Sequence, residues 1–270
     1  MPARASITVL AAGAVAAALA SWTGGFAAPG RIVLTDNRPT AVVVDAELVI
    51  AVDVSNSMDP EEQALQRGGY IAGLTSAEFL SAVRDGANGR IAVTYFEWAG
   101  PNDQKVVLPW RLIDGPETAA AVVAEIAAAP YRSAPRTSIF GALQFAKRLF
   151  FLDSGYRGLR RIIDVSGDGP NNIGLPVTFM RDDVVGAGIT INGLPIILKR
   201  PYGTGTEHPN LDVYYEDCVI GGPGAFMIAI HEREQFKDAT RNKLVQEIAA
   251  VPKPRGVPAQ SRSRPRVYCS

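Results

Sequence analysis

The chain has 270 residues, of which 47% are hydrophobic and 20% are charged, and its formal net charge is zero. This composition is typical of a folded globular protein and argues against a disordered chain or a coiled coil. Zero net charge also argues against nucleic-acid binding, because proteins that bind nucleic acid carry a basic surface. The length suits one large domain or two small ones.

The N-terminal segment differs in composition from the rest of the chain. Arg4 is followed by an uncharged, alanine-rich run from Ile7 to Ala20. A basic start, a short apolar run and small residues after it are typical of a secretory signal peptide, which we place at residues 1–28. The run is short for a membrane-spanning helix, which needs roughly 20 apolar residues. We therefore expect a periplasmic or secreted protein, with N-terminal anchoring to the inner membrane as the alternative.

A lead-in segment over residues 29–45, with one edge strand at most, precedes the first core strand. Residues 48–54 are a continuous run rich in Val and Ile, which is typical of a strand buried on both faces. A Pro preceded by Asp and followed by two Glu then marks the start of a helix over residues 60–74. We expect Gly68 and Gly69 to interrupt or loosen this helix.

The remaining elements follow from the same patterns of apolar residues and breakers. Pro109 marks one strand as an edge strand that can pair with its predecessor as a hairpin. Residues 199–225 are Gly-rich and predict a long loop, and residues 251–270 form a basic tail that we expect to be disordered. Further strands are expected at residues 90–98, 105–110, 159–165, 189–198 and 225–230, and further helices at 77–83, 116–129, 138–152, 177–187 and 234–250.

This alternation of strands and helices predicts the fold class. It indicates an α/β domain over residues 46–250, with a doubly wound, mostly parallel central sheet, one antiparallel edge strand and helices on both faces. In such sheets, ligands bind outside the carboxyl ends of the strands. Polar residues that follow the expected strands are therefore the candidates for a functional site.

Two of the expected buried strands end in polar runs, at residues 53–57 and 164–169. A threonine at residue 137 opens a helix between them. Hydroxyl and carboxylate oxygens suit hard cations, so these side chains predict a site for Mg²⁺ (or Mn²⁺ or Ca²⁺). The predicted ligands are Asp53, Ser55, Ser57, Thr137 and Asp168.

The order Asp-x-Ser-x-Ser, then Thr, then Asp resembles the metal-ion-dependent adhesion site of von Willebrand factor type A (VWA) domains. All five positions match, and the likeness covers residues 46–250. It implies that Ser55, Ser57 and Thr137 contact the metal, while Asp53 and Asp168 act mainly through water or by orienting the ligands. Residues 96–98 and 217–226 resemble more closely a bacterial exported branch of this family, known only as a domain of unknown function.

Several nearby residues have more ordinary interpretations. Helix capping would explain Asp53 and Ser57, but it does not explain Thr137 and Asp168 together. We interpret Asp164 as hydrogen-bonded to backbone at the end of the sheet rather than as a ligand.

Glu97 and Trp98 follow a strand at the same rim as the predicted ligands. They are candidates for partner recognition, with a half-buried structural role as the equal alternative. His208 and His231 are the only histidines, and neither lies in a nucleophile motif, which disfavours a Ser/His hydrolase.

The chain contains two cysteines, Cys218 and Cys269. In an oxidising compartment they can form a disulfide. The alternative is a buried thiol at Cys218 and a free thiol at Cys269, and the sequence leaves both interpretations open.

These patterns favour a metal-dependent protein-binding module of adhesion or scaffold type, acting outside the cytoplasm. In it, the cation bridges to an exposed Asp or Glu of an unknown partner protein, and the basic tail is available for peripheral contact with the envelope. The alternative is a metal-assisted hydrolase that uses the same Asp and Ser cluster, with Glu97 or Asp164 as general base. We do not expect an enzyme, because the sequence shows no convincing catalytic constellation. A purely structural envelope protein is the third hypothesis.

Overall fold

The computed structural model describes residues 40–152, 154–198, 208–249 and 267–269. The predicted signal peptide, most of the lead-in segment and most of the basic tail lie outside these ranges. Arg38–Ser270 form one compact unit.

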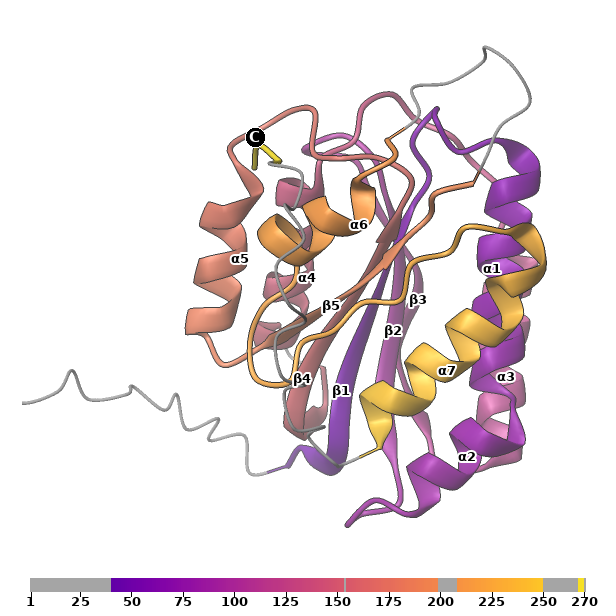
Figure 1. The fold of residues 1–270 in the computed structure, drawn as a ribbon. Helices are drawn as coiled ribbons and strands as arrows, with labels where there is room; N and C mark the ends of the chain where they lie inside the picture. Colours follow the sequence, from indigo (N-terminus) through magenta and orange to yellow (C-terminus); the bar gives the residue numbers. More distant parts are fainter. Residues whose placement is uncertain (1–39, 153, 199–207, 250–266, 270) are drawn as a thin grey trace, which may run out of the picture. The chain divides into compact units, whose positions relative to one another are not determined.

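A five-stranded sheet forms the centre of the described residues (Figure 1). The strand order is β3-β2-β1-β4-β5, in which only β3 is antiparallel to its neighbour. This arrangement confirms the predicted fold class, including the single antiparallel edge strand. The strands are β1 (Val42–Asp53), β2 (Ile91–Trp98), β3 (Gln104–Ile113), β4 (Tyr156–Gly167) and β5 (Thr190–Pro195).

Helices cover both faces of the sheet (Figure 1). Each face has its own buried apolar cluster, and β1 contributes to both because its side chains alternate between them. One face carries α1 (Pro60–Leu74), α2 (Ala77–Arg84), α3 (Pro116–Ala128) and α7 (Phe236–Ile248). The other carries α4 (Ile139–Phe151), α5 (Val177–Gly186), α6 (Leu211–Tyr214) and the π-helix η1 (Tyr215–Val219).

Helix α1 is continuous, so the prediction that Gly68 and Gly69 loosen it is wrong. Close packing against α7 explains Gly69, because a Cβ atom there would lie 2.8 Å from Oγ1 of Thr240. Gly73 is similar, since its Cβ would lie 2.7 Å from Cδ1 of Leu244. The absence of side chains on this face of α1 lets the two helices approach closely.

The region after β5 also differs from the prediction. Residues 225–230 do not form a strand but make isolated bridges, Gly193 to Met227 and Ile196 to Ile230. The predicted loop contains α6 and η1, which bury Tyr215 against the sheet. A Cβ atom at Gly193 would lie 2.6 Å from Cδ1 of Tyr215, so this strand glycine makes room for the aromatic ring.

Cys218 and Cys269 form a disulfide. The bond attaches the end of the chain to η1, and Val267 packs against the apolar cluster on the same face. The last described residues of the predicted basic tail are therefore held on the domain, whereas residues 250–266 lie outside the described ranges.

Three charged side chains lie in the core between β4 and α7. The ammonium of Lys243 contacts the carboxylate of Asp164 and lies 2.6 Å from Oε1 of Glu247. Asn192 also donates a hydrogen bond of 3.0 Å to Glu247. Burial, followed by the negative charge of Asp164, raises the pKa of Glu247 to about 7. Asp164 thus ion-pairs with α7, a role that the sequence analysis did not predict.

Replacing Glu247 by Gln is expected to weaken the pH dependence of stability. The folded protein retains a proton on Glu247 that the unfolded chain loses, so the free energy of unfolding falls as the pH rises from about 4.5 to about 7. The stabilisation lost across this range is on the order of a few kcal/mol. Thermal unfolding across this pH range measures it, with Glu234→Gln as the surface control. Equal pH slopes for wild type and Glu247→Gln would contradict the assignment.

Candidate metal centre

The turn after β1 brings three of the predicted ligands together. Asp53, at the end of the strand, is fully buried, and its Oδ1 accepts a hydrogen bond of 2.7 Å from the backbone N–H of Ser55. The hydroxyl oxygens of Ser55 and Ser57 lie 2.8 Å apart. The Asp-x-Ser-x-Ser segment is therefore a compact turn whose side-chain oxygens converge.

Asp168 reaches the same turn from the neighbouring strand. It follows β4, which pairs in parallel with β1 over most of its length. The hydroxyl of Ser57 donates a hydrogen bond of 2.7 Å to Oδ1 of Asp168. Two segments that are 111 residues apart therefore share one cluster of oxygens, as the sequence analysis expected.

The loop that contains Thr137 is hydrogen-bonded to both of these segments. Ala134 pairs with Ser55 through an isolated parallel bridge, and its carbonyl accepts a 2.9 Å bond from Asn56. The N–H of Thr137 donates to Oδ1 of Asn172, and its carbonyl accepts from the N–H of Asn172, both at 2.9 Å. Arg136, with φ of 77°, turns the chain between these anchors. Thr137 is thus held in the loop that crosses from β1 to the residues after β4.

The chemistry of the cluster fits a hard divalent cation. Oδ2 of Asp53 is buried without a hydrogen-bond partner among the described residues. Burial, and then the negative charge of Asp168, raise the pKa of Asp53 well above its usual value. A cation would offset both effects, and hydroxyl and carboxylate oxygens are ligands that hard cations prefer.

The hydroxyl groups are essential to this interpretation. Within the described ranges, no group of three or more His, Cys, Asp or Glu side chains is placed to hold a metal ion. Asp53 and Asp168 alone supply too few donors, so Ser55, Ser57 and Thr137 would have to complete the set.

The absence of a side chain at Gly167 leaves room for the carboxylate of Asp53. A Cβ atom at Gly167 would lie 2.7 Å from Oδ2 of Asp53 and 3.1 Å from the hydroxyl oxygen of Tyr215. The Tyr215 hydroxyl is buried, and burial together with the charge of Asp53 raises its pKa. The position before Asp168 is therefore restricted to glycine by the site itself.

Glu97 and Trp98 do not face a partner, which corrects that expectation. Their exposed fractions are 1% and 0%. Oε1 of Glu97 lies 2.6 Å from the guanidinium of Arg67, and Oε2 lies 3.1 Å from that of Arg132. These ion pairs fix the segment that leads from α3 to Thr137, so Glu97 has a positioning role.

His208 lies beside the candidate centre, although its Gly-rich sequence context predicts an ordinary loop residue. A Cβ atom at Gly169 would lie 3.8 Å from both Cδ2 and Nε2 of His208. Burial lowers the pKa of His208, and the charge of Asp168 opposes that shift. No motif links His208 to residue 168, because the two residues lie on separate segments that only the tertiary structure brings together.

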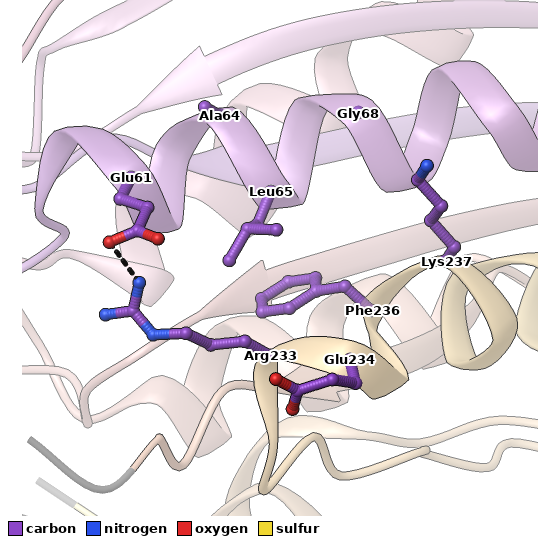
Figure 2. Close-up of a pocket in the computed structure, with 8 residues that line it drawn as sticks. All are labelled: Glu61, Ala64, Leu65, Gly68, Arg233, Glu234, Phe236 and Lys237. Atoms are coloured by element: carbon purple, nitrogen blue, oxygen red, sulfur yellow. Dashed lines mark ion pairs between the residues drawn. The ribbon is translucent and has the colours of Figure 1, made fainter.

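A surface groove of about 480 Å³ lies between α1 and the start of α7 (Figure 2). Leu65 and Phe236 line its apolar part, and an ion pair between Glu61 and Arg233 crosses it. None of the predicted metal ligands lines this groove, so it is a feature separate from the candidate metal centre.

Comparison with solved structures identifies the fold as that of VWA domains. A VWA protein from Catenulispora acidiphila matches over 76% of this chain with a TM-score of 0.52 and 16% identity. The pilus adhesin SpaC from Lactobacillus rhamnosus GG matches over 76% with a TM-score of 0.53 and 13% identity. Proximal thread matrix protein 1 from the mussel byssus, in a structure with a zinc-occupied metal-ion-dependent adhesion site, matches over 77% with a TM-score of 0.50 and 14% identity.

The chain belongs to the family described as "Protein of unknown function (DUF1194)", which matches residues 43–252. The solved structures are larger proteins, since the chain spans 43%, 30% and 47% of their respective lengths. No curated protein matches the sequence. None of the helices in the described part of the chain is both long and apolar enough to cross a membrane.

Replacing Gly167 by Ala is expected to impair cation binding. The new methyl group would displace the Asp53 carboxylate, which should lower Mg²⁺ affinity by roughly 10- to 100-fold and stability by about 1–3 kcal/mol. Gly186→Ala is the matched control, because a Cβ there meets nothing within 4 Å. Calorimetric titration with Mg²⁺ gives the affinity, and an unchanged affinity in Gly167→Ala would show that Asp53 does not belong to the site.

Proposed function

We propose that this protein is an exported, metal-dependent protein-binding module. In this proposal, Ser55, Ser57 and Thr137 hold Mg²⁺ or a similar hard cation. Asp53 and Asp168 orient these ligands and offset the positive charge of the cation. A cation held mainly by neutral hydroxyls supplies an electrophilic position for an Asp or Glu side chain of a partner. The observation that carries the proposal is the contact between Ser57 and Asp168, which joins two distant segments around one cluster of oxygens.

The chain's own residues have separable roles in this proposal. Ser55 and Ser57 present hydroxyl oxygens at the end of β1, where their mutual contact fixes their orientation. Asp53 pins the turn through the N–H of Ser55 and keeps its second oxygen for the cation or a coordinated water. Glu97 acts at a distance by holding the loop before Thr137 through its two arginine partners.

Export is the second part of the proposal. The apolar run near the N-terminus favours a signal peptide. The disulfide between Cys218 and Cys269 supports an oxidising compartment, because disulfides are rare in the cytosol. Mass spectrometry of the protein recovered from the periplasm or medium would test this, and a cytoplasmic protein with an intact N-terminus would contradict it.

Asp53→Asn is expected to abolish cation binding while the fold survives. In the absence of metal, the variant should be at least as stable as wild type, because it removes a buried carboxylate that Asp168 repels. Wild type should gain stability as Mg²⁺ is added, and the variant should gain none. Thermal unfolding with Mg²⁺ or with chelator measures both effects, with Asp182→Asn as a surface control.

Partner binding provides the functional test. Immobilised wild type should retain an envelope protein in Mg²⁺ and release it in chelator, and Asp53→Asn and Ser55→Ala should retain none. Ser81→Ala, remote from the centre, should behave like wild type. If Ser55→Ala held the same partner with unchanged affinity and the same response to chelator, the proposed binding mode would be wrong.

A metal-assisted hydrolase is the second candidate function, and His208 is the observation that favours it. A histidine beside Asp168 is a group that can accept a proton from a water molecule at the centre. Phosphate monoesters and carboxylic esters, assayed with and without Mg²⁺, would show turnover that depends on both the metal and His208. Equal rates in wild type and His208→Ala, with His231→Ala as the control, would remove this candidate.

A further inference from the structure

Large apolar side chains are exposed at the end of the sheet where the parallel strands begin, opposite the candidate metal centre. Strands β1 and β4 begin at this end, where Val42 pairs with Tyr156. Phe151 and Leu152, at the end of α4, are 47% and 55% exposed, and Leu159 on β4 is 65% exposed. Single exposed apolar residues are common on soluble proteins, but several on adjoining segments indicate an interaction surface.

Register and contacts place these residues on one face. Leu159, Arg161 and Ile163 follow one another at intervals of two residues and therefore share one face of β4, and Ile163 packs in the cluster beneath α4. The guanidinium of Arg161 lies over the ring of Phe151, 5.4 Å from its centroid. The end of α4 and the start of β4 therefore form one continuous surface.

Two further arginines give this surface a positive charge. Arg148, on the last turns of α4, and Arg157, two residues before Leu159, are both exposed. Neither has an ion-pair partner among the described residues, whereas Arg161 lies 3.2 Å from the carboxylate of Glu47. Asp153 belongs to the connecting segment but lies outside the described ranges. We call the set Arg148, Phe151, Leu152, Arg157 and Leu159 the basal patch.

The chain's own tail is a poor occupant for the basal patch. Helix α7 ends beside the start of β4, because Arg160 donates hydrogen bonds of 2.8 and 2.7 Å to the carbonyls of Glu247 and Ile248. The residues that follow, from Pro252 to Arg266, contain five basic residues and no acidic one. Like charge disfavours contact between that segment and the arginines of the patch. An external anionic surface, in contrast, would attract both.

We propose that the basal patch docks on an anionic lipid surface. Phe151, Leu152 and Leu159 would enter the interfacial region, and Arg148 and Arg157 would contact lipid phosphates, a combination typical of peripheral membrane attachment. Because the patch and the metal centre lie at opposite ends of the parallel strands, the docked domain presents the metal centre away from the lipid. This inference does not depend on cation binding.

Vesicle sedimentation of residues 38–270, the compact unit, tests the proposal without the apolar N-terminal segment. The protein should bind phosphatidylglycerol-containing vesicles and should not bind phosphatidylcholine alone. Phe151→Ser/Leu159→Ser and Arg148→Gln/Arg157→Gln should each weaken binding by about tenfold or more. Leu175→Ser/Phe179→Ser is the matched control, because Leu175 and Phe179 are 58% and 66% exposed but follow the carboxyl end of β4.

Two control experiments distinguish lipid binding from the binding of free phosphate, and a specific loss of binding from a loss of folding. Soluble glycerol phosphate should not displace the protein from vesicles, and each variant should keep the wild-type unfolding temperature within a few degrees. Equal vesicle binding by wild type and Phe151→Ser/Leu159→Ser would overturn the proposal, as would displacement by glycerol phosphate, which would indicate a site for free phosphate.

Discussion

Parallel pairing of β1 with β4 is the constraint on which the candidate metal centre depends. The register places Val52 opposite Ser166, so both strands end at the same level of the sheet. Their following residues then meet, and Ser57 can reach Asp168. Because parallel strands need a long crossover between them, the loop that carries Thr137 is a product of the same topology. A shift of one strand by two residues would separate the carboxylates from the hydroxyls.

This arrangement buries the Asp53 carboxylate without a cationic partner among the described residues. Asp53 is fully buried, and Asp168 places a second carboxylate near it. The described residues place no lysine or arginine against either oxygen of Asp53. The core also buries Asp164 and Glu247, but there the ammonium of Lys243 lies within contact distance of both carboxylates. A lysine therefore lies beside the carboxylates beneath α7, whereas the described residues place no cationic side chain within ion-pair distance of Asp53. This contrast is a stronger argument for a metal than the motif alone.

Much of the fold was predictable because its signals are local. The apolar run of β1 predicted a strand buried on both faces, and the Asp-Pro-Glu-Glu segment predicted the start of α1 at Pro60. The places of the five candidate ligands in the fold were predictable because each follows a strand or opens a helix in a recognisable order. Asp53, Ser55, Ser57 and Asp168 are joined by hydrogen bonds as expected, and Thr137 is held in the adjacent loop.

The features that the sequence did not predict depend on tertiary contacts. Gly69 is tolerated within α1 because Thr240 packs where a side chain would be, which no local propensity describes. Glu97 looked like a rim residue, but its two arginine partners come from α1 and from the loop before Thr137. His208 lies beside the candidate centre only in the tertiary structure, because no local pattern links it to residue 168. The pairing of Cys218 with Cys269 likewise required the position of η1.

A crystal structure of residues 38–270 grown with Mn²⁺ would test the central claim most directly, because anomalous scattering locates the ion independently of the protein atoms. The account predicts one strong peak within bonding distance of the hydroxyl oxygens of Ser55, Ser57 and Thr137, with Asp53 and Asp168 beside it. A protein that binds Mn²⁺ elsewhere, or a hydroxyl of Thr137 turned away from the peak, would contradict it.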